Sequence, residues 1–200
     1  PDAAGVTWRV CDVEQPATLA PALQGIDVAY YLVHSMGEHG ADYAARDRAA
    51  ASAFAEAAAS AGVRRLVYLG GPMPAGTPSE HLRSRMEVGE VLRAGRVPVV
   101  ELRASMIVGD GSASWQIVRD LAMRLPAMVL PRWLRSRTCP VALDDVIVAL
   151  CRAADVPLAH SEWFDIPGPD TLSGREILQQ IAALAGRKIH AVEVPLLTPK

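Results

Sequence analysis

Continuous apolar runs alternate with longer mixed segments over the first half of the chain. Three such runs, at 26–33, 65–69 and 98–102, are rich in Val, Leu and Tyr. Runs that are apolar on both faces are typical of strands inside a parallel sheet. A shorter run, VTWRVC at 6–11, predicts another strand. The pattern therefore predicts four strands in this half of the chain.

The segments between these runs have the composition of helices. We predict helices at 17–24, 41–61 and 79–94, each followed directly by a glycine. A glycine just past the last helical residue is a common C-terminal signal. Strand and helix thus alternate four times, which predicts an α/β fold with a doubly wound parallel, Rossmann-like sheet. Ligands of such sheets bind beyond the carboxyl ends of the strands.

The second half has shorter and less regular elements. We expect helices at 114–125 and from Asp144 or Asp145 to 154, and strands at 138–142 and 163–166. Ser173 and Glu176 form a capping box that opens a helix to Ala185. These elements predict a small C-terminal lobe. The expected division is residues 1–111 for the sheet domain and 112–200 for the closing lobe.

Composition and charge narrow the function classes. The 200 residues are 50% hydrophobic with a net charge of −2, so no overall attraction to nucleic acid or to an anionic membrane is expected. The three cysteines form no CxxC pair, so neither a zinc site nor a disulfide framework is supported. No apolar run reaches the roughly 18 residues of a membrane helix. A cytoplasmic protein without a metal fits these features best.

Two histidine positions could carry chemistry. His81 and Arg85 lie four residues apart on a predicted helix and so point the same way. A proton donor beside a cation is a useful pair, although a solvated helix face is the plainer interpretation. His34 and Ser35 follow an apolar strand and could touch a ligand, or His34 could be structural.

Two further patterns are weaker. Gly109-Asp-Gly111 lacks the third glycine of a dinucleotide fingerprint and is better interpreted as a turn. The basic stretch of Arg132, Arg135 and Arg137 could bind a phosphate, or it could be a solvated or ion-paired surface.

Several longer strings resemble one known family. They are IDVAYYLVHSM at 26–36, AGVRRLVYLGG at 61–71, HLRSRMEVGE at 81–90, ELRASMIVGDGS at 101–112, PVALDDVIVAL at 140–150 and FDIPGPDTLSGREILQQIA at 164–182. Together they resemble an atypical extended short-chain dehydrogenase/reductase of the NmrA-like NAD(P)H-binding branch, from about Cys11 to Pro195. The resemblance implies a Rossmann sheet and NAD(P)(H) as cofactor, with the choice between NAD and NADP left open.

The resemblance also implies roles for single residues. Asp12 and Val13 match positions beside the adenine, and His81 and Arg85 fall where active members carry Tyr and Lys. The remaining positions match segments along the nicotinamide half of the cofactor: Leu32, Val33, His34, Ala104, Ser105 and Met106.

The chain departs from the family pattern in two ways. Arg85 can hold a ribose but cannot relay a proton, and Gly70 and Gly71 stand where members often have serines. The Gly-rich first turn that grips the pyrophosphate is absent, so we expect a fragment lacking the first βαβ unit. The run at 26–33 should then form an exposed sheet edge, and 6–11 should pack loosely or pair abnormally.

These features predict an NAD(P)(H)-binding, short-chain dehydrogenase/reductase-like oxidoreductase with an altered catalytic pair, His81 and Arg85. The substrate would be a small molecule of a class the sequence does not identify. The alternative is a non-catalytic dinucleotide-binding sensor or assembly factor that acts on a protein partner. A third hypothesis is that these 200 residues hold no cofactor tightly.

Overall fold

The computed structural model describes residues 5–34, 43–74, 76–125 and 127–194. Contacts divide the chain into two units. The first comprises 1–103 and 150–165, and the second comprises 104–149 and 166–200. The expected assignment of cofactor binding to 1–111 and substrate binding to 112–200 stays a prediction.

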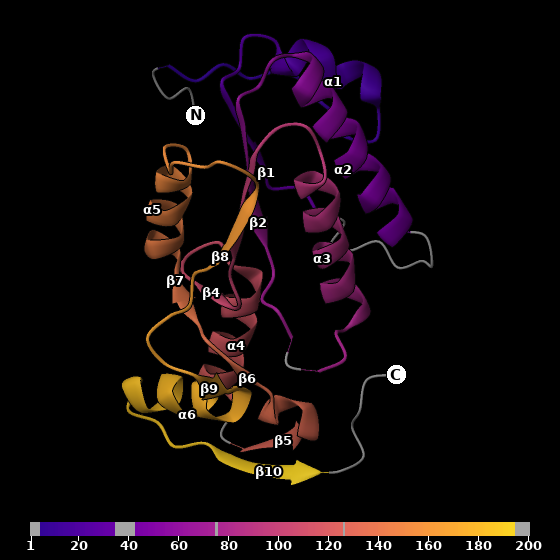
Figure 1. The fold of residues 1–200 in the computed structure, drawn as a ribbon. Helices are drawn as coiled ribbons and strands as arrows, with labels where there is room; N and C mark the ends of the chain where they lie inside the picture. Colours follow the sequence, from indigo (N-terminus) through magenta and orange to yellow (C-terminus); the bar gives the residue numbers. More distant parts are fainter. Residues whose placement is uncertain (1–4, 35–42, 75, 126, 195–200) are drawn as a thin grey trace. The chain divides into compact units, whose positions relative to one another are not determined.

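The first unit is built on a parallel sheet of four strands (Figure 1). In spatial order they are β1 (Val28–Tyr31), β2 (Arg65–Gly70), β3 (Val99–Arg103) and β8 (Glu162–Asp165). Every neighbouring pair runs parallel. The α/β, Rossmann-like sheet expected from the alternation of apolar runs is confirmed.

Three helices cover one face of this sheet: α1 (Pro16–Leu23), α2 (Tyr43–Ser60) and α3 (Glu80–Arg93) (Figure 1). The core between them contains Leu19, Leu66 and Leu92, none of which is exposed to solvent. The three helices therefore form one layer against the strands, as the helix predictions for 17–24, 41–61 and 79–94 require.

The buried face of α2 consists largely of alanine. Ala50, Ala51, Ala55 and Ala58 are buried, and Ala51 and Ala58 have no exposed surface. Side chains this small let α2 pack closely on its neighbours, because no branched group separates the backbones. The helix ends before Gly62, whose φ of +77° lies in the left-handed region that glycine adopts without strain.

The opposite face of the sheet meets the C-terminal end of α5 (Leu143–Ala153). Arg65 Nη1 donates hydrogen bonds to the carbonyl oxygens of Ala153 and Ala154, at 3.0 and 2.7 Å. Tyr30 Oη donates to the Leu150 carbonyl at 3.2 Å. These bonds satisfy orphan carbonyls at the helix end and fix it to β1 and β2.

The strand predicted at 6–11 is wrong, because this segment forms no ladder with any described strand. Its large apolar side chains are exposed to solvent: Trp8 is 75% and Val10 is 96% exposed. β1 is consequently an edge strand of the described sheet, and Leu32 and Val33 just beyond it are about half exposed. An exposed apolar edge and a loosely packed 6–11 segment were both expected.

The second unit is built from short pieces. Its helices are α4 (Ala113–Arg124) and α6 (Gly174–Leu184), and its longest strands, β5 (Ala127–Pro131) and β10 (His190–Val194), pair in parallel. Its other short elements are two pairs of two-residue strands and a single turn of helix. They are β4 (Ile107–Val108) with β7 (Val141–Ala142), β6 (Arg137–Thr138) with β9 (Leu172–Ser173), and η1 (Arg132–Arg135).

The capping box predicted at the start of α6 is present. Ser173 Oγ accepts from the Glu176 N–H at 3.2 Å, and Glu176 Oε2 accepts from the Ser173 N–H at 2.6 Å. The core of this unit contains Ala122, Met128, Leu130 and Leu178. β5 and β10 were not predicted from the sequence.

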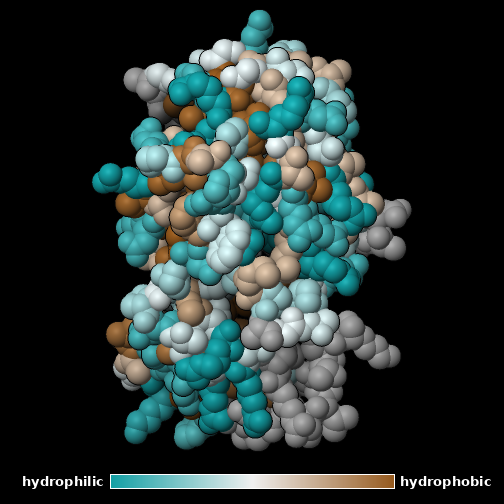
Figure 2. Space-filling model, viewed as in Figure 1, coloured by the Kyte–Doolittle hydropathy of each residue, from teal (hydrophilic) through white to brown (hydrophobic). Residues whose placement is uncertain are grey.

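The visible surface mixes hydrophobic and hydrophilic patches rather than presenting one apolar face (Figure 2). Within the described ranges, no helix has both the length and the hydrophobicity needed to cross a bilayer.

Candidate functional site at the strand ends of the first unit

The carboxyl ends of β1, β2 and β3 lie at the same edge of the sheet. Tyr31 is level with Tyr68, and Gly70 is level with Arg103 in the strand register. Side chains that follow these strands, or that α3 presents beside them, therefore meet at one edge. This edge is the place where ligands bind in open parallel sheets.

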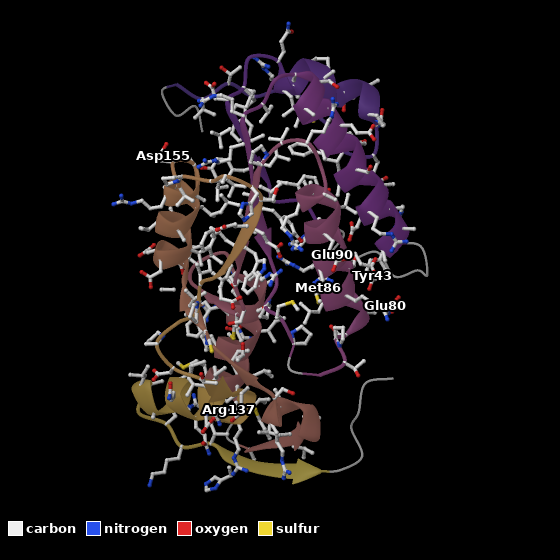
Figure 3. The ribbon with its side chains drawn as sticks, in the orientation of Figure 1. Tyr43, Glu80, Met86, Glu90, Arg137 and Asp155 are labelled. Atoms are coloured by element: carbon white, nitrogen blue, oxygen red, sulfur yellow. The ribbon has the colours of Figure 1, made fainter. Side chains whose placement is uncertain are left out.

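The helix α3 begins at this edge. Ser79 caps it by accepting a hydrogen bond from the Leu82 N–H at 3.2 Å. Nearby, Tyr43 at the start of α2 and Glu80 at the start of α3 lie close together (Figure 3). Partial desolvation and then the Glu80 carboxylate raise the pKa of Tyr43, while Arg83 lowers it.

Arg85 is fixed to β2 by two hydrogen bonds. Its Nη2 donates to the Leu69 carbonyl at 2.7 Å, and its own carbonyl accepts from Tyr68 Oη at 2.9 Å. The Nε atom is buried and has no hydrogen-bond partner among the described residues. A buried donor without an acceptor is costly, so a further acceptor at this position would be favourable.

His81 lies one helical turn before Arg85 and next to His34, which follows β1. The two imidazole rings are 6.3 Å apart between centroids and tilted by 58°. Burial, then Arg85, then His34 lower the pKa of His81, while Asp47 raises it. The ring is therefore mostly neutral at pH 7 and is a stronger acid when it is protonated. Ser35, which was considered together with His34, lies outside the described residues.

Asp47 on α2 is a residue that the sequence interpretation missed. Its Oδ2 accepts a hydrogen bond from Ser84 Oγ at 3.0 Å, which joins α2 to α3 where Ser84 is buried. The same carboxylate helps to raise the pKa of Tyr31 and of Tyr68, for which burial is the larger cause. The signal was present, because Arg46-Asp47-Arg48 interrupts an otherwise alanine-rich helix.

Gly70 and Gly71 follow β2 at positions where a side chain would collide with its neighbours. A Cβ on Gly71 would lie 2.7 Å from Leu82 Cδ1, and one on Gly70 would lie 3.0 Å from Glu101 Oε1. A serine therefore does not fit at Gly71 unless Leu82 moves. The absence of a hydroxyl here is built into the packing of α3 on β2.

A buried ion cluster supports this end of β2. Glu101 of β3 is 2% exposed and pairs with Arg93 of α3 and with Arg103 of its own strand. The Arg103 guanidinium also stacks over the Trp163 ring of β8, 4.2 Å from its centroid. The cluster joins β3, β8 and α3. It was not predicted, because one carboxylate in a strand sequence does not reveal its partners.

Asp12 and Val13 lie in a tight turn before α1. Asp12 Oδ1 accepts from the Glu14 N–H at 2.9 Å, and Oδ2 accepts from Gln15 Nε2 at 2.7 Å. Both oxygens thus have a local role, and the predicted contact with adenine stays a prediction. Val13 packs partly against the core of the first unit.

Ala104, Ser105 and Met106 follow β3 and begin the second unit. Ala104 is 5% exposed, Ser105 Oγ donates to the Cys139 carbonyl, and the Met106 carbonyl accepts from the Val141 N–H at 3.0 Å. Their expected contact with the nicotinamide half stays a prediction. The structure brings together His34, His81 and Arg85 from the predicted set.

The basic stretch in the second unit is engaged within the protein. Arg137, labelled in Figure 3, donates to the Thr171 carbonyl, and its Nη1 lies 3.6 Å from Glu176 Oε2. Arg135 also has an interaction partner, and the Arg132 side chain lies outside the described part. The ion-paired interpretation of this stretch is favoured over a phosphate site.

A family model described as NAD(P)H-binding matches residues 1–123, which is more than half of the chain. The chain belongs to the NAD(P)H-binding family. NAD(P)(H) is accordingly its cofactor class. No curated protein matches the sequence.

Solved structures agree with this assignment at the level of the fold. A short-chain dehydrogenase/reductase superfamily protein from Agrobacterium tumefaciens with bound NAD is 20% identical; the match covers 98% of this chain and 76% of that one, with a TM-score of 0.75. Triphenylmethane reductase of Citrobacter sp. complexed with NADP(H) is 16% identical over 96% and 64% of the two chains, with a TM-score of 0.75. The fold of this NAD(P)H-binding protein is that of short-chain dehydrogenases/reductases.

A third structure, MoeE5 in complex with UDP-glucose and NAD, is 18% identical over 88% of this chain and 68% of that one, with a TM-score of 0.71. The residues of the NAD(P)H-binding protein fit such a cofactor at one point in particular. The buried, unpartnered Nε of Arg85 is a donor that a ribose hydroxyl would satisfy. The narrower assignment to the NmrA-like branch stays a prediction.

Proposed function

We propose that the protein is an NAD(P)(H)-dependent oxidoreductase in which Arg85 binds the nicotinamide ribose and His81 is the proton donor. The observation that carries the proposal is the pairing of these two side chains at the strand ends. Arg85 is held by Leu69 and keeps a buried donor free, while His81 lies beside it with a lowered pKa.

Each residue has a separate task in this proposal. When bound, the reduced nicotinamide supplies a hydride. Arg85 donates hydrogen bonds to the ribose and, by its charge, keeps His81 ready to release a proton. His81 gives that proton to the oxygen of the reduced substrate. His34 restricts the position of the His81 ring and contributes to its lowered pKa.

The remaining predicted contacts complete the cofactor site. Leu32 and Val33, which are about half exposed after β1, offer apolar surface for the nicotinamide half. Asp12 and Val13 are proposed to contact the adenine, and 104–106 to close over the nicotinamide. The substrate is a small molecule and the compartment is the cytoplasm.

A non-catalytic dinucleotide sensor is the second candidate, favoured by the two glycines after β2. Because a Cβ at Gly71 would collide with the end of the Leu82 side chain, the packing disfavours a hydroxyl that would polarise a carbonyl there. A sensor would bind the dinucleotide and pass its redox state to a protein partner without turnover.

The test of both candidates begins with titrations of NADPH and NADH into the protein, which are monitored by intrinsic fluorescence and by calorimetry. Arg85→Gln should weaken binding about tenfold or more, which corresponds to the loss of hydrogen bonds to a charged donor. Arg83→Gln is the matched control, because Arg83 lies on the same helix but is exposed. Equal affinities for the two variants would reject the role of Arg85.

The second step separates enzyme from sensor. His81→Asn should abolish reduction of aldehydes, enones or quinones while the dinucleotide still binds with its original affinity. Unchanged turnover in this variant would reject His81 as the donor. Tight dinucleotide binding by the original protein with no turnover of any of these substrates would instead support the sensor.

A further inference from the structure

The second unit contains a cavity of about 640 Å³ between α4, β5 and α6. All of its lining residues belong to this unit. Its main walls are Ile117 and Leu121 of α4, Met128 and Leu130 of β5, and Ile177 and Leu178 of α6. A volume of this size falls within the range of roughly 300–1,000 Å³ that is typical of small-molecule sites.

The described lining of the cavity carries no charged side chain. Among the described residues that line the cavity, none is Asp, Glu, Lys, Arg or His. A charged ligand would lose its hydration here without gaining a partner, which is strongly unfavourable. An uncharged ligand meets no such penalty.

Three hydroxyl groups give the apolar lining a few polar contacts. Ser114, Ser136 and Thr138 line the cavity, and within the described part of the chain their hydroxyls make no hydrogen bond. Each can donate one hydrogen bond, for which a carbonyl or ether oxygen on a ligand is a suitable acceptor. A few polar groups in an apolar surround are typical of sites that orient a small molecule.

The cavity is open to solvent on one side, where apolar side chains remain uncovered. Ile117 is 61% and Val129 is 58% exposed, although both are large hydrophobic residues that line the cavity. A ligand lodged against them would remove this surface from water. A concave site whose described lining is uncharged favours a small molecule over a polar protein surface.

We propose that this cavity binds an uncharged, largely apolar small molecule that carries one or two carbonyl oxygens. The further step, that such compounds are the substrate class of the enzyme, rests on the proposed function. Binding in the cavity does not.

The experiment uses prodan, an uncharged naphthalene ketone whose fluorescence reports an apolar environment, without dinucleotide. A sulfonated anilinonaphthalene is the charged counterpart. The protein should bind prodan at least about tenfold more tightly than the sulfonate. Equal binding of both probes would overturn the proposal, because it would indicate non-specific apolar adsorption.

Three variants locate the bound probe. Ile117→Glu places a charge at the cavity and should weaken prodan binding about tenfold or more. Leu184→Glu makes the same kind of change on α6 at a residue that is 90% exposed and outside the lining, so it should leave binding unchanged. Ala127→Trp, at an exposed lining position, should obstruct the cavity without altering the core. Equal effects of Ile117→Glu and Leu184→Glu would overturn the proposal.

Sedimentation of the same samples tests the competing occupant, a second copy of the chain. A dimer that Ile117→Glu dissociates, with prodan binding unaffected, would assign the face to self-association and overturn the ligand site. NADPH titration of each variant separates the two proposals. If the protein binds prodan but not NADPH, only the proposed function is rejected. If it binds NADPH but not prodan, only the proposed ligand site in the cavity is rejected.

Discussion

The two units place their charged residues in opposite ways. The first unit gathers cations and a buried carboxylate at the strand ends, where Arg85 keeps a free donor and Glu101 pairs with two arginines. In the second unit, the described cavity lining contains no charged side chain, and Arg137 pairs with Glu176 away from it. The strand ends of the first unit are thus lined by charged side chains, whereas the described lining of the cavity in the second unit is uncharged.

The largest expected effect concerns the buried cluster of the first unit. Glu101→Ala would leave Arg93 and Arg103 without their carboxylate and should lower the free energy of unfolding by about 3–5 kcal/mol. Denaturant titration measures the change. Glu162→Ala is the control, since its pair with His160 is largely solvent-exposed and contributes about 1 kcal/mol or less. Similar losses of unfolding free energy in both variants would show that the buried cluster stabilises the fold no more than an exposed ion pair does.

A slightly smaller effect is expected from packing in the second unit. A Cβ on Gly168 would overlap the Pro140 carbonyl oxygen, which is backbone and cannot swing away. Gly168→Ala should therefore lower the free energy of unfolding by about 3 kcal/mol, at the upper end of overpacking costs. Gly71→Ala is the matched variant in the first unit, where the obstacle is the flexible end of Leu82. Thermal unfolding should show a smaller loss for Gly71→Ala, and a larger one would contradict this reasoning.

The N-terminal cap of α6 provides a third test of the comparison between the two units. Ser173→Ala removes the acceptor for the Glu176 N–H and should lower the free energy of unfolding by about 1 kcal/mol. Ser173→Asp preserves an acceptor and should recover most of the loss. Because Ile177 and Leu178 of α6 line the cavity, the affinity for prodan should fall in Ser173→Ala and largely recover in Ser173→Asp. The affinity for NADPH should not change in either variant.

The smallest effect is a pH dependence that belongs to the first unit. The pKa of His81 is lowered on folding, so below about pH 6.5 the unfolded chain binds more protons at this residue than the folded one. Acidification from pH 7 to 5 should therefore destabilise the original protein more than His81→Asn. Identical pH profiles of the free energy of unfolding would refute a lowered pKa.

Much of the first unit could be predicted from its sequence. The runs at 65–69 and 98–102 are largely apolar and became the interior strands β2 and β3. The run at 6–11 looks similar but forms no strand, because no described neighbour supplies a ladder for it. Local composition can indicate that a strand is favoured but not that a partner is present.

The second unit was harder to predict for a physical reason. Several of its strands are only two residues long, and β5 and β10 are joined across about sixty residues of chain. Elements this short have no periodicity to detect, so tertiary contacts decide where they form. α6 is the exception, since Ser173 and Glu176 mark its start locally.

The candidate site was predicted in part. The four-residue spacing placed His81 and Arg85 on one helix face, but nothing in the spacing placed His34 beside His81. That proximity depends on the parallel order of β1 and β2 and on how α3 packs over them. Glu101 and Asp47 were missed for the same reason, because their partners come from other elements.

The alanine face of α2 restricts how this protein can diverge. Ala51 and Ala58 are wholly enclosed, so substitution by valine or leucine would force the neighbouring helices apart. Exposed positions on the same helix, such as Ser52 and Glu56, have no such limit. Among descendants of this sequence, the inward alanines of α2 should therefore persist while its outer surface drifts freely.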